Sequence, residues 1–170
     1  MRLALLCAPL LALAGCASHP PITTEPQVDI PRFMGTWHVI AHIPAFLERN
    51  AFKATETYAL TPPNVVQTTF RFREGALDGP EKVYRPTGYV DLASGGGLWG
   101  MQFLWPIKAE FRIVHVSPDY RHTIIGRSAR DYVWIMSREQ HPSETDYADL
   151  VARVKAAGYD TAQLRRVPQG

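Results

Sequence analysis

One feature constrains the fold of this chain more than any other: a succession of short segments rich in β-branched and aromatic residues between Thr36 and Arg138. Gly, Pro, Asn and Asp separate the segments, and the stretch has no long helical period. We expect strands at approximately 36–43, 53–60, 64–73, 81–91, 99–105, 109–117, 120–127 and 131–138. The sequence therefore predicts an all-β domain.

The turns between these segments indicate how the strands are connected. They lie at residues 62–64, 74–80, 117–119 and 126–130, and such short turns join neighbouring antiparallel strands. Eight strands is also the number at which a closed barrel either fills its interior with side chains or holds one small ligand. We therefore expect an eight-stranded antiparallel up-and-down barrel.

One helix is expected after the last strand. Ser143 is a suitable N-cap, acidic residues follow it, and Gly158 is a plausible stop. The apolar residues at helical spacing are Tyr147, Leu150, Val151 and Val154. A single apolar stripe needs a partner surface, so this C-terminal α-helix should pack on the outside of the barrel.

The N-terminus carries a targeting pattern. Arg2 precedes an apolar run over residues 3–13, and the run leads into Leu13-Ala14-Gly15-Cys16. This pattern resembles a bacterial lipoprotein signal peptide, and the run is too short to stay in a bilayer as a helix. The resemblance implies that residues 1–15 are removed and that Cys16 is acylated and anchors the chain. The alternative is an ordinary secretory signal with an accidental cysteine.

The residues after Cys16 are expected to form an extended, uncovered tether. Pro20, Pro21 and Pro26 lie there among polar residues, a composition typical of linkers. We place the lipidated cysteine and tether at residues 16–29 and one domain at residues 30–170. Ala17 occupies the position where, by a rule for Gram-negative lipoproteins, aspartate favours retention in the inner membrane. Its presence there implies transfer to the outer membrane.

The mature chain offers little reactive chemistry. Removing 15 of 170 residues leaves 155, enough for one domain. Cys7 is lost with the signal and Cys16 is used by lipid, so no disulfide, thiolate nucleophile or cysteine metal ligand remains. The chain has no block of Lys and Arg, and nucleic acid is not expected as a partner.

Three motifs carry a family resemblance. They are Gly35-Thr36-Trp37, the stretch DYRHTIIG at residues 119–126, and the stretch DYVWIMSR at residues 131–138. In this order they resemble the three signatures of the lipocalins, and the third has the form found in bacterial outer-membrane lipocalins. With residues 54–60 and the trailing helix, the resemblance covers most of residues 30–160. It implies the same barrel fold, while the loop at 94–97 and the segment 71–86 depart from the pattern.

The resemblance also implies a closed base for the barrel. The tryptophan that matches Trp37 closes the narrow end in lipocalins, and the arginine that matches Arg138 lies across its indole ring. Gly35 would then serve the backbone geometry at the start of the first strand. These three residues are expected to be structural, because a stacked guanidinium is well suited to closing a base.

A ligand cavity is expected at the other end. Alternation along a strand places Val39 and Ala41 on the face of Trp37, and Tyr132, Trp134 and Met136 on the face of Arg138. On the sixth expected strand, either Phe111, Ile113 and His115 or Arg112, Val114 and Val116 face inward. The candidate cavity residues are Val39, Ala41, Phe111, Ile113, Tyr132, Trp134 and Met136. Ordinary core packing is the alternative for each of them.

The first connection, residues 44–52, is expected to form a mouth loop. It carries Phe46, Leu47 and Phe52, and exposed apolar residues at a rim are consistent with the entry of a lipid tail. They could equally fold down as a lid.

No catalytic motif, cofactor site or metal site is predicted. The chain lacks Gly-x-Ser-x-Gly, His-Glu-x-x-His and a phosphate-binding loop. His38 and His42 are four residues apart, which in a strand separates them by about 13 Å, too far for one metal ion.

The sequence therefore predicts an outer-membrane lipoprotein of the lipocalin family that stores or transports a fatty acid or a lysophospholipid. Whether it forms a homodimer stays open. Three alternatives remain: an enzyme acting on a lipid or terpenoid, a haem or tetrapyrrole carrier with His115 as axial ligand, and a filled barrel that serves as an envelope interaction module.

Overall fold

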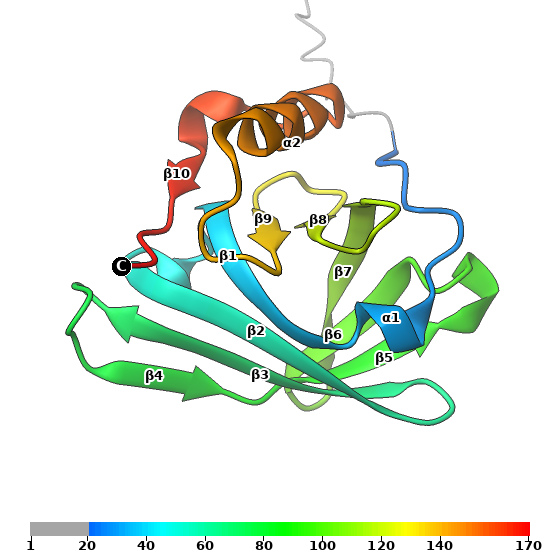
Figure 1. Ribbon diagram of the computed structural model, residues 1–170. Helices are drawn as coiled ribbons and strands as arrows, with labels where there is room; N and C mark the ends of the chain where they lie inside the picture. The colour runs from blue at the N-terminus through cyan, green and yellow to red at the C-terminus, as the bar shows by residue number, and fades with distance from the viewer. Residues whose placement is uncertain (1–20) are drawn as a thin grey trace, which may run out of the picture.

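The computed structural model describes residues 21–170, which form a strongly curved antiparallel sheet that closes on itself (Figure 1). The strands are β1 (Gly35–Ile43), β2 (Ala51–Thr61), β3 (Val65–Glu74), β4 (Glu81–Tyr84), β5 (Thr87–Asp91), β6 (Leu98–Leu104), β7 (Ile107–Val116), β8 (His122–Gly126), β9 (Val133–Ser137) and β10 (Arg165–Arg166). From β1 to β9 each strand pairs with the next along the chain, except that β4 and β5 both pair with β3, and β9 pairs with β1 to close the barrel. The predicted signal peptide and Cys16 lie outside the described residues.

The expected eight-stranded up-and-down barrel is confirmed, with one strand divided in two. The segment expected as a single strand at 81–91 forms β4 and β5, which pair with different parts of β3. Arg85 and Pro86 separate them, because proline has no N–H for the ladder. Taken together, β4 and β5 occupy one of the eight positions around the barrel, and the short β10 lies beside β1.

The helices lie at the ends and on the outside of the barrel. They are α1 (Ile30–Phe33), η1 (Phe46–Glu48), η2 (Leu92–Ser94), α2 (Glu144–Ala156) and η3 (Thr161–Gln163). Ser143 caps α2 by accepting a hydrogen bond from the Asp146 backbone N–H at 3.1 Å, as the sequence predicts. No helix within residues 21–170 has the length and apolar character needed to cross a bilayer.

Two apolar clusters hold the fold together. One fills the barrel interior. The other lies between α2 and the outer face of β1, β8 and β9, over which the helix runs (Figure 1). Leu150 and Val154 of the helix are buried there. The expectation that the helix packs on the outside of the barrel is therefore confirmed.

The prediction that Ala41 faces the cavity is wrong. The register between β1 and β9 shifts between Val39 and Ala41, so Ala41 pairs with the outward-facing Ile135 and joins the cluster under α2. A β-bulge adds one residue and reverses the alternation beyond it. As a result, His42 is the residue opposite the inward-facing Trp134.

The second half of the predicted tether is not uncovered. Within residues 21–28, which we term the N-terminal strap, Ile22 and Val28 are buried. The Glu25 backbone N–H donates to the carbonyl of Ile113 at 2.8 Å, and that of Val28 donates to the carbonyl of Gly95 at 2.9 Å. Two apolar side chains and these backbone hydrogen bonds fix a segment whose proline content suggested a free linker.

Gly95 allows this close approach. It has a φ of +72°, and a Cβ atom there would lie 2.0 Å from the carbonyl oxygen of Pro26. The Gly-rich loop at 94–97 departs from the family pattern in sequence. It is the surface against which the backbone of the strap packs.

Candidate functional site

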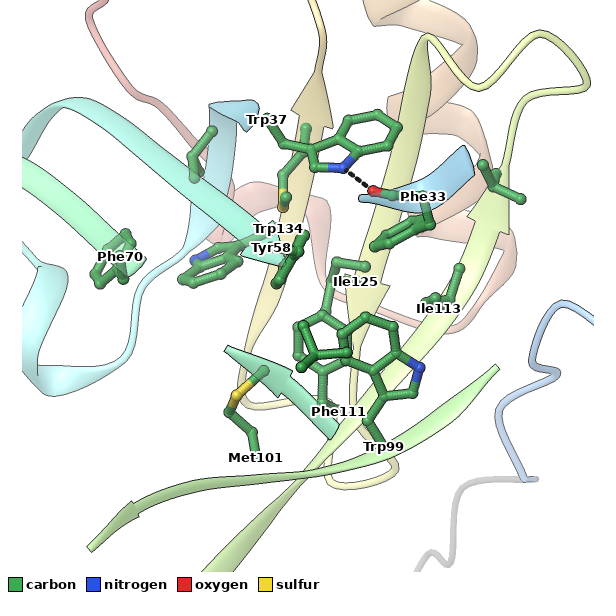
Figure 2. Packing of buried hydrophobic residues seen from close by; sticks show 14 of the residues in the cluster. Phe33, Trp37, Tyr58, Phe70, Trp99, Met101, Phe111, Ile113, Ile125 and Trp134 are labelled. Carbon is green, nitrogen blue, oxygen red and sulfur yellow. Dashed lines mark hydrogen bonds between the residues drawn. The ribbon is translucent and has the colours of Figure 1, made fainter. Parts of the chain in front are cut away.

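The base of the barrel is closed by Trp37 and Arg138. The Trp37 indole N–H donates to the carbonyl of Phe33 at 2.9 Å (Figure 2). The Arg138 guanidinium carbon lies 3.7 Å from the Trp37 ring centroid. Arg138 also donates to four carbonyls, those of Arg32, Phe33, Thr36 and Met34. The structure therefore brings together the two residues that the resemblance paired.

Gly35 is adjacent to this plug. Its φ is +93°, and a Cβ atom there would lie 3.3 Å from Nη1 of Arg138. Both the backbone conformation and the nearby guanidinium favour glycine at this position.

Aromatic rings fill the barrel above the base. Phe33 contacts Tyr58 with ring centroids 5.6 Å apart, and Trp99 stacks on Phe111 at 5.0 Å (Figure 2). Three of the predicted cavity residues belong to this interior cluster and do not line the cavity: Val39, Ile113 and Met136. Their position corresponds to the alternative of ordinary core packing.

The direction of β7 is decided by a second bulge. The register with β8 shifts between Ile113 and His115. Phe111 and Ile113 face inward before the shift, while His115 lies on the outside, with Nδ1 3.9 Å from Oε2 of Glu25 in the strap. His115 is therefore not placed to ligate a haem inside the barrel.

A cavity of about 150 Å³ occupies the open end. Its apolar lining comes from Ala45, Leu47, Phe70, Tyr84, Met101, Phe103, Ala109, Phe111, Tyr132 and Trp134. Phe111, Tyr132 and Trp134 are the three predicted cavity residues found in this lining. The Trp134 ring lies between Phe70 and Tyr132, at centroid distances of 5.1 and 5.2 Å. The cavity wall is thus mainly aromatic.

Exposed apolar side chains surround the mouth on two sides. On the first connection, Phe46 is 79% exposed, and Leu47 is half exposed and reaches into the cavity. Phe52 was predicted in this loop but lies in β2, where it pairs with Arg73. Across the mouth, the β6–β7 hairpin exposes Phe103, Leu104, Trp105 and Ile107. We did not predict this hairpin as part of the rim, although an apolar run at a turn could have indicated it.

A buried carboxyl group that no sequence motif indicated lies under the mouth loop. Glu48, at the end of η1, is 3% exposed and accepts hydrogen bonds from the Ala45 backbone N–H and the Trp134 indole N–H, each at 3.0 Å. Burial raises the pKa of Glu48 to about 7. The Nδ1 atom of His42 is 3.8 Å away, but burial lowers the pKa of His42 to about 4, so this histidine is neutral at pH 7.

A second buried acid, Glu56, lies in β2 and also lines the cavity. It is 1% exposed, and its Oε2 accepts a hydrogen bond from the Tyr58 hydroxyl at 2.6 Å. Burial raises the pKa of Glu56 to about 8, and the nearby Glu48 adds to that rise. Alternation offered a signal for this site, because Glu56 shares its strand face with the buried Ala54 and Tyr58.

Two further charged residues line the cavity, and each is paired. Glu110 accepts hydrogen bonds from Arg112 and Ser128, and Arg127 forms a bidentate pair with Asp131. Within residues 21–170, no group of three or more His, Cys, Asp or Glu side chains is arranged to hold a metal ion.

A closed barrel with a plugged base and an aromatic cavity at its open end defines a small β-barrel protein of the ligand-binding class. The family model described as a lipocalin-like domain matches residues 28–169, and the chain belongs to the lipocalin family. It is therefore a small-molecule-binding lipocalin, of a family whose members bind small hydrophobic ligands.

Relatives and solved structures agree with this assignment. The chain is 28% identical to temperature-induced lipocalin-1 of Arabidopsis thaliana, over 84% of this chain and 80% of the relative. It is 27% identical to the outer membrane lipoprotein Blc of Escherichia coli K12, over 95% and 92%. The structure of insecticyanin from the tobacco hornworm Manduca sexta superposes with a TM-score of 0.69 at 14% identity, covering 87% and 84% of the two chains.

Proposed function

We propose that this protein is an outer-membrane-anchored lipocalin that binds a single-chain lipid, a fatty acid or a lysophospholipid, for storage or transport. The observation that carries this proposal is the continuity between an aromatic cavity and an exposed apolar rim, since Leu47 and Phe103 belong to both. Burying an acyl chain there would stabilise the complex by roughly 25 cal/mol per Å² of apolar surface removed from water. The protein would act by binding and release, without catalysis.

The size of the cavity limits how such a lipid would lie. A protein cavity of about 150 Å³ can hold a molecule such as benzene, so this cavity would take part of an acyl chain. The remainder would lie along the apolar rim between the first connection and the β6–β7 hairpin. An anionic headgroup would stay at the mouth, where Arg127 lies, because the interior acids Glu48 and Glu56 would repel it when ionised.

The anchor proposal rests on the N-terminal pattern and on a relative. Residues 1–15 would be removed, Cys16 would carry the lipid, and residues 16–20 would connect it to the strap. The similarity to an outer membrane lipoprotein over 95% of this chain supports this arrangement. Replacing Cys16 with Ser should release the protein from the membrane fraction and abolish incorporation of labelled palmitate. Unchanged fractionation would contradict the anchor.

Lipid binding is tested by native mass spectrometry on the Cys16→Ser protein, titrated with palmitate and with a lysophospholipid. A stoichiometric adduct that disappears on delipidation and returns with one lipid is expected. Ala109→Trp places a large ring at the cavity wall and should abolish the adduct, whereas Ala152→Trp on the exposed face of α2 should not. The absence of an adduct with every lipid would favour the filled-barrel alternative.

A further inference from the structure

The charge of the cavity does not match a buried anion. Three carboxyl groups line it, those of Glu48, Glu56 and Glu110, against the single guanidinium of Arg127. Arg127 is paired with Asp131, and Glu110 with Arg112. In the part of the chain that the structure describes, no Lys or Arg forms an ion pair with Glu48 or Glu56. These two acids are therefore without a positive partner inside the barrel.

Glu56 is the deeper and less satisfied of the two. Its hydrogen-bond partner in the structure is the Tyr58 hydroxyl, whereas a carboxylate has about four acceptor positions. A buried carboxyl group is costly unless it is paired, and an apolar residue would fill this position on β2 without that cost. Such a residue in a ligand cavity points to a ligand that supplies the missing partner.

The walls around these acids also favour a cation. Phe70, Tyr84, Tyr132 and Trp134 present aromatic side chains to the same cavity. Aromatic faces attract ammonium groups through their quadrupoles, and aromatic cages bind amine-derived cations in this way. Carboxyl groups and aromatic rings on one small cavity form a suitable site for an organic ammonium ion.

The volume of the cavity sets the size of its occupant. About 150 Å³ is enough for one aromatic ring or a short alkyl group, and much less than the 300–1,000 Å³ of drug-sized sites. A long chain would have to extend onto the rim, but a compact ligand would fit entirely inside.

We propose that the cavity binds a compact primary amine with an aromatic or short apolar body, its ammonium group on Glu56 with Glu48 as the second acceptor. This inference rests on the proposed function in one respect: both require that the cavity is the ligand site. The amine's body would pack against Trp134 and Phe70, which lie side by side at the cavity wall.

The test is isothermal titration calorimetry at pH 8.5, above the pKa of about 8 that burial gives Glu56, with three probes of matched body: phenethylamine, 2-phenylethanol and 3-phenylpropanoate. On the unmodified domain, phenethylamine should bind about tenfold more tightly than either other probe, since a charge-assisted hydrogen bond is roughly twice as strong as a neutral one. This comparison does not depend on the folding of any variant.

Two variants then locate the ammonium group. Glu56→Gln should reduce phenethylamine affinity about tenfold, to that of 2-phenylethanol, and leave 2-phenylethanol unchanged. Glu139→Gln, an exposed acid paired with Arg121 away from the cavity, is the matched control and should change nothing. Equal or tighter binding of 3-phenylpropanoate, or an unchanged affinity in Glu56→Gln, would overturn the inference.

The same samples separate this inference from the proposed lipid function. Palmitate or lysophospholipid adducts without a preference for phenethylamine would overturn the amine site alone. Phenethylamine binding that Glu56→Gln weakens to the level of 2-phenylethanol, in the absence of any lipid adduct, would support the amine site and contradict the lipid class.

Discussion

The indole N–H of Trp134 donates to both carboxyl oxygens of Glu48, at 3.0 Å each. This contact joins β9, the last strand of the barrel, to η1 in the first connection. Glu48 also accepts from the Ala45 backbone N–H, so one side chain fixes the segment that covers the open end. The apolar residues Phe46 and Leu47 are thereby held at the rim.

Trp134→Phe should loosen this cover, because it keeps an aromatic ring and removes the N–H donor. We expect the free energy of unfolding to fall by about 1–3 kcal/mol, the cost of a buried group left without its partner. Hydrogen exchange at residues 45–49 should accelerate. The exposed Trp105→Phe serves as control, and unchanged protection in Trp134→Phe would contradict this role of the indole.

Trp37→Ala should destabilise the domain strongly. Trp37 is fully buried, donates to Phe33 and stacks under Arg138, so truncation leaves a large cavity and removes the ring on which the guanidinium stacks. Urea denaturation should show a loss of about 3–5 kcal/mol. Trp105→Ala, at a residue 81% exposed, should change stability by less than about 0.5 kcal/mol. If Trp37→Ala lowered the free energy of unfolding no more than an ordinary surface substitution does, Trp37 would not be the residue that closes the base of the barrel.

The buried acid Glu56 makes stability depend on pH. Burial raises its pKa from 4.5 to about 8, so the folded protein keeps a proton that the unfolded chain releases. The free energy of unfolding therefore falls as pH rises from 4.5 to about 8. Glu56→Gln should remove this loss and be more stable than the wild type at pH 8 by up to about 4 kcal/mol, since one pKa unit corresponds to about 1.4 kcal/mol.

Urea unfolding at pH 4.5, 6.5 and 8 measures this difference. The wild type and Glu56→Gln should be about equal in stability at the lowest pH. The difference between their free energies of unfolding should increase as the pH rises. Glu139→Gln, at the surface, should show the same dependence of stability on pH as the wild type. A Glu56→Gln protein that is less stable at pH 8 would show that the carboxylate is favourable in the fold.

Gly95→Ala should detach the strap. The added Cβ would collide with the carbonyl of Pro26, and alanine is also strained at a φ of +72°. Gly75→Ala is a matched control, because its φ is +81° and a Cβ atom there meets nothing within 4 Å. Gly95→Ala should therefore cost about 2 kcal/mol more than Gly75→Ala in urea denaturation and expose residues 21–28 to protease. Equal costs would mean that the strap contributes little.

Local patterns in the sequence were sufficient to predict the architecture of the fold. Strand alternation and turn residues predicted the barrel, and the Ser143 cap with its apolar stripe predicted α2 and its outward position. The pairing of Trp37 with Arg138 came from motif resemblance. Among the cavity residues, Tyr132 and Trp134 were placed by alternation from Arg138, since the β8–β9 register has no shift in this part of the chain. The sequence left the direction of Phe111 open, and the structure decided it.

Only the tertiary structure decided the rest. Bulges in β1 and β7 turned Ala41 and His115 outward, and a bulge depends on the hydrogen-bond register with a partner strand, which one strand's sequence does not contain. The burial of Glu48 and Glu56 depends on which rings from distant strands surround them. The strap is held by carbonyls of Gly95 and Ile113, far along the chain. Alternation is a property of neighbours in sequence, whereas burial and register are properties of neighbours in space.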